Sequence, residues 1–323
     1  MPLTIAMTGA TGFAGRHAVE ALLSKGHRVR ALVRDASKAA LPPLVEPVAG
    51  DLDSADALHK LAEGADVFLH VAGAISAVNR AGFFAVNQIG TLNAIAAAKA
   101  AGVRRFVYVS SLAGREPTLS PYGASKASAE DIVRGVGLSH VIVRPPAIYG
   151  PGDRATLPLI KALTRPIAML PTTADTRFSL LHVRDMASIL AEACKSRREG
   201  LFELSDGKAG GYSWAELCAI AGAHEGHAVR PVFLPRGLVS AVASVSEAVA
   251  RFRKQPGMVS HGKVAELYHP DWVAGGEGWP LKSFTLFPEG FAETLAWYRQ
   301  RGWLPQPRGA GRSTVQNKPE TRQ

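Results

Sequence analysis

Apolar and polar residues follow a regular rhythm through the first half of the chain. Short apolar runs are separated by longer segments whose apolar positions lie three or four residues apart. The runs predict strands at 3–8, 28–33, 45–49, 67–71, 106–110 and 141–144, and the longer segments predict helices at 13–25, 53–62, 83–101 and 122–136. Strands that alternate with helices form a parallel sheet with helices on both faces. We therefore predict an α/β fold with a doubly wound parallel sheet.

The rhythm changes after Pro145, where prolines interrupt the chain at irregular intervals. Two further short strands are expected at 178–183 and 201–204, around a helix at 184–195, and both strands are expected to return to the main sheet. The predicted domain organisation is therefore discontinuous: 1–145 with 178–205 form the sheet domain, 146–177 with 206–303 form a smaller irregular substrate-binding part, and 304–323 form a disordered tail poor in apolar residues.

The segment 236–254 carries a single apolar stripe. Its apolar residues follow one another at spacings of four, three, four and three, which places them on one side of a helix: Leu238, Val242, Val245, Val249 and Phe252. Such a stripe needs a partner, and we expect it to pack against the protein itself. Because basic residues flank the segment, a substrate lid and weak contact with a membrane surface stay open as alternatives.

Composition and charge exclude several classes of function. The chain has 323 residues, 47% of them apolar, enough to bury a substantial core, and no apolar run is long enough to span a membrane. The formal charge of +10 fits an anionic cofactor, and no basic run is interleaved with aromatic residues as in a nucleic-acid surface. Two cysteines without metal-ligand spacing predict neither a disulfide framework nor a metal site, and favour the cytoplasm.

A glycine-rich segment directly follows the first predicted strand and opens the first predicted helix. Glycine lets the backbone turn tightly and lets a pyrophosphate approach the amide groups, while the positive end of the helix favours its charge. We therefore predict a phosphate-binding loop made of Thr8, Gly9, Thr11, Gly12, Phe13, Ala14 and Gly15.

A second group of residues has the chemistry that hydride transfer requires. Tyr122 lies four residues before Lys126, so both side chains share one face of the predicted helix. The lysine cation would stabilise the phenolate and make Tyr122 a usable proton donor or acceptor. Ser111 follows the strand that ends at Ser110 and would hydrogen-bond the substrate oxygen; Ser110 is the alternative. Asn87 is either a further member of this group or a polar residue that satisfies the backbone at a helix kink.

These motifs, in this order, resemble the extended short-chain dehydrogenase/reductase family, which includes nucleotide-sugar epimerases, hydroxysteroid dehydrogenases and dihydroflavonol reductases. The resemblance covers most of 2–304 and rests on the glycine loop and on the segments 50–52, 70–74, 87–91, 110–111, 122–126 and 144–153. It implies a Rossmann-type, NAD(P)-binding sheet domain and catalysis by Ser111, Tyr122 and Lys126, with Asn87 as the family's helix asparagine. It also implies that the cofactor contacts these residues: Asp51, Leu52, Ala72, Gly73, Tyr122, Lys126, Pro146, Ala147 and Ile148.

The residues after the second strand bear on the choice of cofactor. An acidic side chain there binds the adenosine ribose and repels an additional phosphate. This chain has Arg34 and then Asp35, and Arg16 lies just past the glycine loop. Arginine grips a phosphate in a bidentate way, so we predict NADP, with NAD as the alternative that Asp35 leaves open.

The substrate is expected to be a mainly apolar small molecule. Ser111 and Tyr122 are only eleven positions apart, whereas sugar-nucleotide enzymes have a longer segment between them. The C-terminal part is similar to hydroxysteroid-dehydrogenase-like and dihydroflavonol-reductase-like members. We expect His182 and the aromatic residues His269, Trp272, Trp279 and Trp297 to be structural. An epimerase or dehydratase and a noncatalytic NADP-binding accessory or sensor protein remain alternatives. The resemblance also implies a homodimer formed through the helices before and containing Tyr122.

Overall fold

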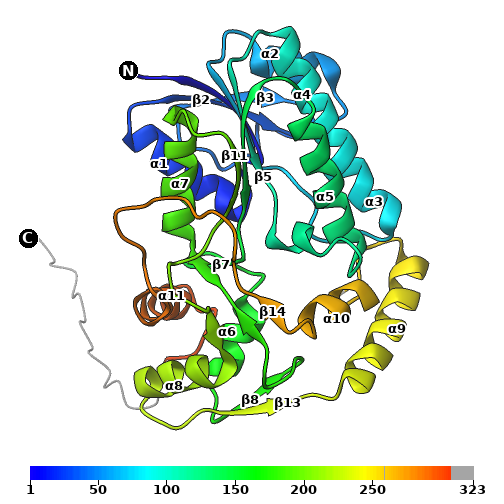
Figure 1. The fold of residues 1–323 in the computed structure, drawn as a ribbon, viewed down its shortest axis with the longest axis vertical. Helices are drawn as coiled ribbons and strands as arrows, with labels where there is room; N and C mark the ends of the chain where they lie inside the picture. Colours follow the sequence, from blue (N-terminus) through cyan, green and yellow to red (C-terminus); the bar gives the residue numbers. More distant parts are fainter. Residues whose placement is uncertain (258, 307–323) are drawn as a thin grey trace, which may run out of the picture.

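A seven-stranded parallel sheet forms the centre of the sheet domain (Figure 1). The computed structural model describes residues 1–257 and 259–306. The strands lie in the order β11-β6-β5-β4-β1-β2-β3. Their bounds are β1 (Thr4–Thr8), β2 (Arg28–Val33), β3 (Val45–Ala49), β4 (Val67–His70), β5 (Arg105–Val109), β6 (Ser139–Arg144) and β11 (Gly200–Glu203). The chain starts at β1 in the middle, builds one side and then the other, which confirms the predicted doubly wound sheet.

Helices cover both faces of this sheet because both faces of its strands are apolar. Along β1, Ile5 and Met7 point to one face, where α1 (Phe13–Ser24) and α7 (Val183–Lys195) pack. Ala6 points to the other face, which is covered by α2 (Ala55–Ala62), α4 (Gly90–Ala100) and α5 (Pro121–Arg134). Figure 1 shows these two helix layers on opposite sides of the strands.

The helix expected at 83–101 is a continuous helical run with a wide turn inside it. It consists of α3 (Arg80–Phe84), the π turn η1 (Ala85–Ile89) and then α4. A π turn inserts one extra residue into the helical ladder and is frequent at functional sites. Asn87, in the middle of η1, is buried.

The second half builds three small sheets around a separate core. β7 (Ala147–Tyr149) pairs with β10 (Leu180–His182), β8 (Ile167–Leu170) pairs with β13 (Arg230–Phe233), and β9 (Arg177–Phe178) lies between β12 (Tyr212–Ser213) and β14 (Asp271–Trp272). The helices α6 (Leu157–Leu163), α8 (Trp214–Glu225) and α11 (Phe287–Gln300) pack with them.

Two expectations for this half are corrected. The strand predicted at 178–183 does not return to the main sheet, because it divides into β9, which pairs with β12 and β14, and β10, which pairs with β7. Only the strand predicted at 201–204 joins the main sheet, as β11. Leu304 is buried in the second core, so the expected tail does not begin there. The rest of that tail, 307–323, lies outside the described residues.

The helix predicted at 236–254 forms as α9 (Arg236–Arg253), but its apolar stripe does not pack against the protein as expected. All five stripe residues are between 44% and 89% exposed. The helix instead packs through Val239, Ala243 and Ala250, and the first two contact Val264 of α10 (His261–Leu267). These contacts lie one position along from Leu238, Val242 and Val249, about 100° around the helix. Among the described residues, every helix is too short or too polar to cross a bilayer.

Candidate active site

The glycine loop has the geometry of a phosphate cradle. Gly9 has a left-handed φ of +75°, and a Cβ there would lie 2.6 Å from the Ala72 backbone nitrogen. A Cβ on Gly15 would lie 1.9 Å from the Gly9 carbonyl oxygen, so only glycine allows α1 to start this close to the turn. Gly12 caps α1 without a side-chain hydrogen bond, and the first turn of the helix contains no acidic residue. Its first N–H groups are therefore free to bind an anion.

Thr8 serves the interior rather than the loop surface. Its side chain is fully buried, and its Oγ1 lies 2.7 Å from Nδ1 of His70 and accepts a hydrogen bond from the Ala72 N–H. The other ring nitrogen of His70 lies 3.1 Å from Oγ1 of Thr91, which donates to the Asn87 carbonyl. Burial, together with the Lys126 cation, lowers the pKa of His70 to about 3, so the ring is neutral. The side chain of Thr8 therefore holds the loop in place from inside and does not lie on the loop surface, where the cofactor is predicted to bind.

The side chain of Asn87 is held by three hydrogen bonds. Its Oδ1 accepts from the Ala74 N–H at 2.7 Å, and its Nδ2 donates to the Ala74 carbonyl at 3.0 Å and to Ser125 Oγ at 2.9 Å. Ser125 in turn donates to the Tyr122 carbonyl at 2.7 Å. The π turn therefore places Asn87 where it links the end of β4 to the helix that carries Tyr122. Sequence reasoning gave no role to Ser125, although it lies inside the 122–126 motif.

Tyr122 and Ser111 come together because two local structures pack without a side chain between them. Ser111 caps the 3-10 helix η2 (Leu112–Arg115), and Ser120 caps α5 by accepting from the Gly123 N–H. A Cβ on Gly123 would lie 2.6 Å from the Ala113 carbonyl oxygen, so this glycine allows the first turn of α5 to lie against η2. This approach brings the Ser111 hydroxyl near the phenol, where it acts to lower the pKa of Tyr122.

The structure separates the two candidate serines. Ser110 is buried, and its Oγ donates to Glu130 Oε1 at 2.5 Å. Glu130 also accepts two hydrogen bonds from Arg144, at 2.9 and 2.6 Å. Ser110 therefore belongs to a buried ion-pair network, whereas Ser111 faces Tyr122, as preferred from the sequence.

The electrostatics of the pair differ from the expectation that Lys126 lowers the pKa of Tyr122. Burial raises the pKa of Tyr122 to about 12, and hydrogen bonding by Ser111 opposes this only in part. Lys126 is buried, and its Nζ donates to the Val109 carbonyl at 2.8 Å and lies 4.5 Å from the centre of the Tyr108 ring. Burial lowers the pKa of Lys126 to about 7, against the attraction of Glu130. In this state the phenol is protonated at neutral pH.

The other predicted cofactor residues lie at the carboxyl ends of three strands of the main sheet, β3, β4 and β6, at the edge where ligands bind in doubly wound sheets. Asp51 and Leu52 follow β3, and Pro146, Ala147 and Ile148 follow β6. Ala72 and Gly73 follow β4, and a Cβ on Gly73 would lie 3.2 Å from Asn87 Oδ1 and 3.6 Å from Lys126 Nζ. The end of β4, Asn87 and Lys126 thus meet at one place.

Arg34 and Asp35 differ in their surroundings at the end of β2. Asp35 accepts hydrogen bonds from the backbone and side chain of Ser37 and pairs with Lys38 at 2.8 Å, and these contacts lower its pKa. Arg34 is exposed. Arg16 donates to the Gly152 carbonyl at 2.9 Å, so it ties α1 to the second half of the chain. The Asp35 carboxylate therefore faces Ser37 and Lys38 of its own loop.

The residues expected to be structural are in the core or in local contacts. Trp279 packs edge-on against Phe202 in the first core, Trp272 packs on the second, and Trp297 contacts Trp303. His182 is fully buried, and burial lowers its pKa to about 4. In the described part of the chain, no three His, Cys, Asp or Glu side chains gather as metal ligands would.

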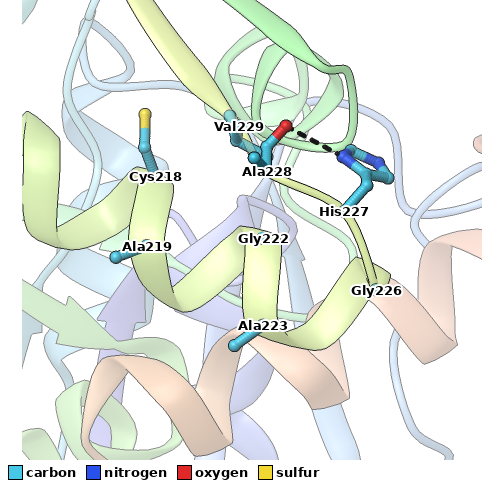
Figure 2. A pocket seen from close by; sticks show the side chains of 8 residues that line it. All are labelled: Cys218, Ala219, Gly222, Ala223, Gly226, His227, Ala228 and Val229. Atoms are coloured by element: carbon cyan, nitrogen blue, oxygen red, sulfur yellow. Dashed lines mark hydrogen bonds between the residues drawn. The ribbon is translucent and has the colours of Figure 1, made fainter.

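A hollow of about 510 Å³ lies away from these residues, against α8 and the turn that follows it. Figure 2 shows its lining, in which His227 hydrogen-bonds the Ala228 carbonyl and Cys218 is the other reactive side chain. Burial raises the pKa of the Cys218 thiol, which makes it a poor nucleophile. The hollow therefore lacks the groups of a catalytic site, and the constellation around Tyr122 is the candidate active site.

The residues present fit a nicotinamide dinucleotide. The uncapped start of α1 and the three close-approach glycines suit its pyrophosphate, and the ends of β3, β4 and β6 suit its two nucleosides. Such a cofactor, when bound, donates or accepts a hydride. The protein's own groups supply a hydroxyl at Ser111, a protonated phenol at Tyr122 and a cation at Lys126.

Comparison with known proteins gives three findings. Residues 5–202 match the family described as "NAD dependent epimerase/dehydratase family". The ceramide reductase of Caulobacter vibrioides is 44% identical over 311 residues, which are 94% of this chain and 96% of that protein. The 3 beta-hydroxysteroid dehydrogenase/Delta 5-->4-isomerase of Mycobacterium tuberculosis is 34% identical over 178 residues, 46% of this chain and 48% of that protein.

The fold is also shared with solved enzymes. The Bordetella bronchiseptica enzyme WbmH, solved in complex with NAD+, superposes with a TM-score of 0.65 at 19% identity, covering 93% of this chain and 99% of that one. At this identity the likeness concerns the fold alone.

Proposed function

This chain belongs to the NAD dependent epimerase/dehydratase family, and on that premise we propose that it is an NADP-dependent reductase acting on the ketone of a long-chain apolar lipid. The observation that carries the proposal is the meeting of Ser111, Tyr122 and Lys126 at the carboxyl end of the sheet. The similarity to a ceramide reductase over nearly the whole chain supports a lipid of the ceramide type as the substrate class.

The residues have distinct roles in this proposal. Ser111 hydrogen-bonds the substrate oxygen and orients it beside the Tyr122 hydroxyl. Because the pKa of Tyr122 is about 12, the phenol carries its proton at neutral pH and donates it to the oxygen that becomes an alcohol. The cation of Lys126 then stabilises the phenolate that remains and holds the nicotinamide ribose. The protonated resting state favours reduction as the working direction.

NADP rather than NAD is supported by the charges after β2. Asp35 is engaged with Ser37 and Lys38, while the Arg34 guanidinium is exposed and can reach a phosphate. Replacing Arg34 by Glu is expected to reduce the ratio of kcat/KM for NADPH over NADH by about ten-fold or more, because a bidentate contact becomes a repulsion. Exchanging the exposed Arg104 for Glu is the matched control, and an unchanged ratio in the Arg34 variant would refute the assignment.

A homodimer is supported by apolar residues on the helical run that precedes α5. Val86, Ile89 and Leu92 are spaced by three residues and are between 36% and 45% exposed. A stripe of this kind is suited to pairing with a second copy. Light scattering should give a dimer mass for the wild type and a monomer mass for Leu92→Glu, whereas Leu44→Glu, at an exposed leucine elsewhere, should remain dimeric.

The cytoplasmic location stays a prediction.

The central experiment measures NADPH consumption with a keto-ceramide and with a short-chain, water-soluble ketone. Tyr122→Phe is expected to lower kcat by about 10²–10⁴-fold while NADPH binding persists. Tyr149→Phe is the matched control, since it also removes a buried hydroxyl and that hydroxyl has no hydrogen-bond partner among the described residues. Full turnover by Tyr122→Phe would refute the proposed function. Wild type that interconverts sugar nucleotides without net NADPH consumption would instead support an epimerase.

A further inference from the structure

We propose that α9 docks this protein on the surface of an anionic lipid bilayer. The identification of the apolar substrate as a membrane lipid rests on the proposed function, but the docking itself can be measured without turnover. The apolar stripe of α9 was expected to pack against the protein itself, and it is exposed instead.

The stripe is exposed along the whole helix. Leu238, Val242, Val245 and Val249 are 44–66% exposed, and Phe252 at the end is 89% exposed. The side that packs on α10 uses the small residues Ala243 and Ala250 with Val239, so it leaves the larger side chains outside. Figure 1 shows α9 at the edge of the molecule, with α10 on one side of it. An amphipathic helix placed in this way can lie in the plane of a membrane interface.

The charges around the stripe are those that anionic headgroups attract. Phe252 stands between Arg251 and Arg253, and Lys254 follows directly. Glu247 is the only acidic residue of α9, and it is occupied by the backbone N–H of His261 at 2.8 Å and by the His261 ring at 3.2 Å. Arg253 and Lys254 form no salt bridge within 1–257 and 259–306. Long basic side chains of this kind keep their charge at the headgroups while an adjacent aromatic residue enters the apolar layer.

A hollow next to the stripe suits an acyl chain. It has a volume of about 660 Å³ and lies between α9 and the turn at 255–257, with Val242, Val245, Val249 and Pro256 in its lining. Arg253 also lines it. An apolar hollow with a cation beside it matches a lipid that has an anionic head and an apolar tail.

The strand pair that leads into α9 extends the apolar surface. Ile167 and Met169 of β8 are 57% and 59% exposed on one side of that strand, and Val232 of β13 pairs with Met169. β13 is joined to α9 through Leu234 and Pro235. Exposed apolar residues on consecutive elements make a larger contact area than one helix provides.

The docking helix is connected to the candidate active site by one short helix. Glu266 of α10 accepts a hydrogen bond from Ser120, the cap of α5, at 2.5 Å. A Cβ on Gly262 of α10 would lie 3.0 Å from Pro121, which precedes Tyr122. α10 thus packs on α9 at one side and on the first turn of α5 at the other. A bilayer held by α9 would therefore lie near the end of the sheet where Tyr122 acts.

A bilayer fits these observations better than a protein partner does. The stripe consists of aliphatic side chains and one phenylalanine and offers no hydrogen-bonding group for specific pairing. Three of the four cations that flank it, Arg251, Arg253 and Lys254, lie together at one end, and Arg236 lies at the other. A second copy would bring the same cations to the interface, where they would repel each other unless they met an acidic patch.

Flotation with vesicles tests the proposal on the full chain. Wild type should bind vesicles of phosphatidylglycerol and phosphatidylcholine and should bind pure phosphatidylcholine much more weakly. Val245→Asn/Val249→Asn and Phe252→Ser should each weaken binding by about ten-fold, since each removes apolar area from the bilayer contact. Arg251→Gln/Arg253→Gln/Lys254→Gln should abolish the preference for the anionic vesicles. Leu44→Asn, at an exposed leucine in another part of the molecule, should bind as wild type does.

The outcomes separate this inference from the proposed function. Turnover of a lipid ketone in vesicles should fall in Val245→Asn/Val249→Asn, while turnover of the water-soluble ketone stays at the wild-type level. Vesicle binding without turnover of either substrate would leave the docking in place and refute the proposed function. Absence of wild-type vesicle binding would overturn the docking. A wild-type dimer lost in this double variant, with no vesicle binding, would overturn it in favour of a second copy.

Discussion

The helices α5 and α9 are both amphipathic, but the protein treats them in opposite ways. On α5 the buried side carries polar groups with assigned partners: Ser125 bonds Asn87 and the Tyr122 carbonyl, Lys126 bonds Val109, and Glu130 bonds Arg144. On α9 the buried side holds little more than valine and alanine, and the larger apolar side chains face outward. Buried polar contacts fix α5 in the protein, whereas α9 leaves an apolar surface exposed.

The difference between the two helices reflects how precisely each must position its side chains. A proton donor must stay within hydrogen-bonding reach of its substrate, which favours a helix locked by buried polar contacts. A surface that meets lipid needs area and charge but no fixed partner. Equivalent substitutions at packed positions of the site, as on α5, and at exposed positions, as on α9, should therefore have very different consequences, and four matched pairs test this.

The largest contrast is expected between two glycine-to-alanine substitutions. Gly15→Ala places a Cβ 1.9 Å from the Gly9 carbonyl oxygen, so the backbone of the loop must move. We expect loss of measurable NADPH binding and a decrease of several kcal/mol in the free energy of unfolding, on the order of an overpacked core. Gly237→Ala in α9 meets no atom within 4 Å and should stabilise by up to about 1 kcal/mol through helix propensity. Cofactor fluorescence and urea denaturation measure both.

Removing one carboxylate charge from each region should give the next contrast. Glu130→Gln removes the nearer of the two buried carboxylates that pair with Arg144, the other being Glu203, and should lower the free energy of unfolding by up to about 3–5 kcal/mol. Glu247→Gln removes the more exposed pairs with His261 and Arg251 and should cost less than about 1 kcal/mol. Equal losses in urea denaturation would show that the two regions are not distinguished by burial.

Lys126 should give a pH-dependent effect on stability. Its pKa is lowered to about 7 in the folded protein and returns to its ordinary value near 10.5 on unfolding. The unfolded chain therefore binds more protons between these values, and this lysine makes wild-type stability rise with pH from about 7 to about 10.5. Lys126→Met removes that slope, so the stability of the variant relative to wild type should increase as the pH falls from about 10 to about 6, by an amount on the order of 4 kcal/mol.

The control for Lys126 is the exposed Lys38, whose replacement by Met removes a surface ion pair with Asp35 and should change the free energy of unfolding by less than about 1 kcal/mol. Urea denaturation from pH 6 to about pH 10 measures both variants. A difference between Lys126→Met and wild type that does not change with pH would contradict the lowered pKa.

The smallest effect is expected on α9. Val245→Asn replaces a side chain that is 66% exposed, and it should change the free energy of unfolding by less than about 0.5 kcal/mol. Val133→Asn places the same amide in the buried core beside α5 and should cost several times more. A large loss of stability in Val245→Asn would mean that its surroundings in solution are packed.

Much of the sheet and of the site could be predicted from the sequence, for a physical reason. Strands 28–33 and 45–49 were predicted with the observed bounds because their buried residues are apolar: four in the first strand, and Val45 and Val48 in the second. Gly9, Gly12, Tyr122 and Lys126 were predictable because their chemistry depends on local spacing. These features are encoded within a few residues of each other.

Features that depend on distant neighbours were not predictable. The side of α9 that packs is shifted by one residue from the expected stripe, because Val264 of α10 meets Val239 and Ala243. The strand predicted at 178–183 divides at Ser179 because the partner Trp272 comes from a later segment. The raised pKa of Tyr122 follows from its burial, which spacing along a helix cannot give.

The hydrogen-bonded chain that begins at Thr8 bears on which half of the molecule can be substituted without moving the candidate active site. It runs from Thr8 through His70, Thr91, Asn87 and Ser125 to the carbonyl of Tyr122. Its ends are the strand before the phosphate loop and the residue that carries the phenol. The distance between the glycine loop and the backbone of Tyr122 is thus fixed inside the sheet domain. On the proposed function, substitutions in the second half could change which substrate binds while this distance stays the same.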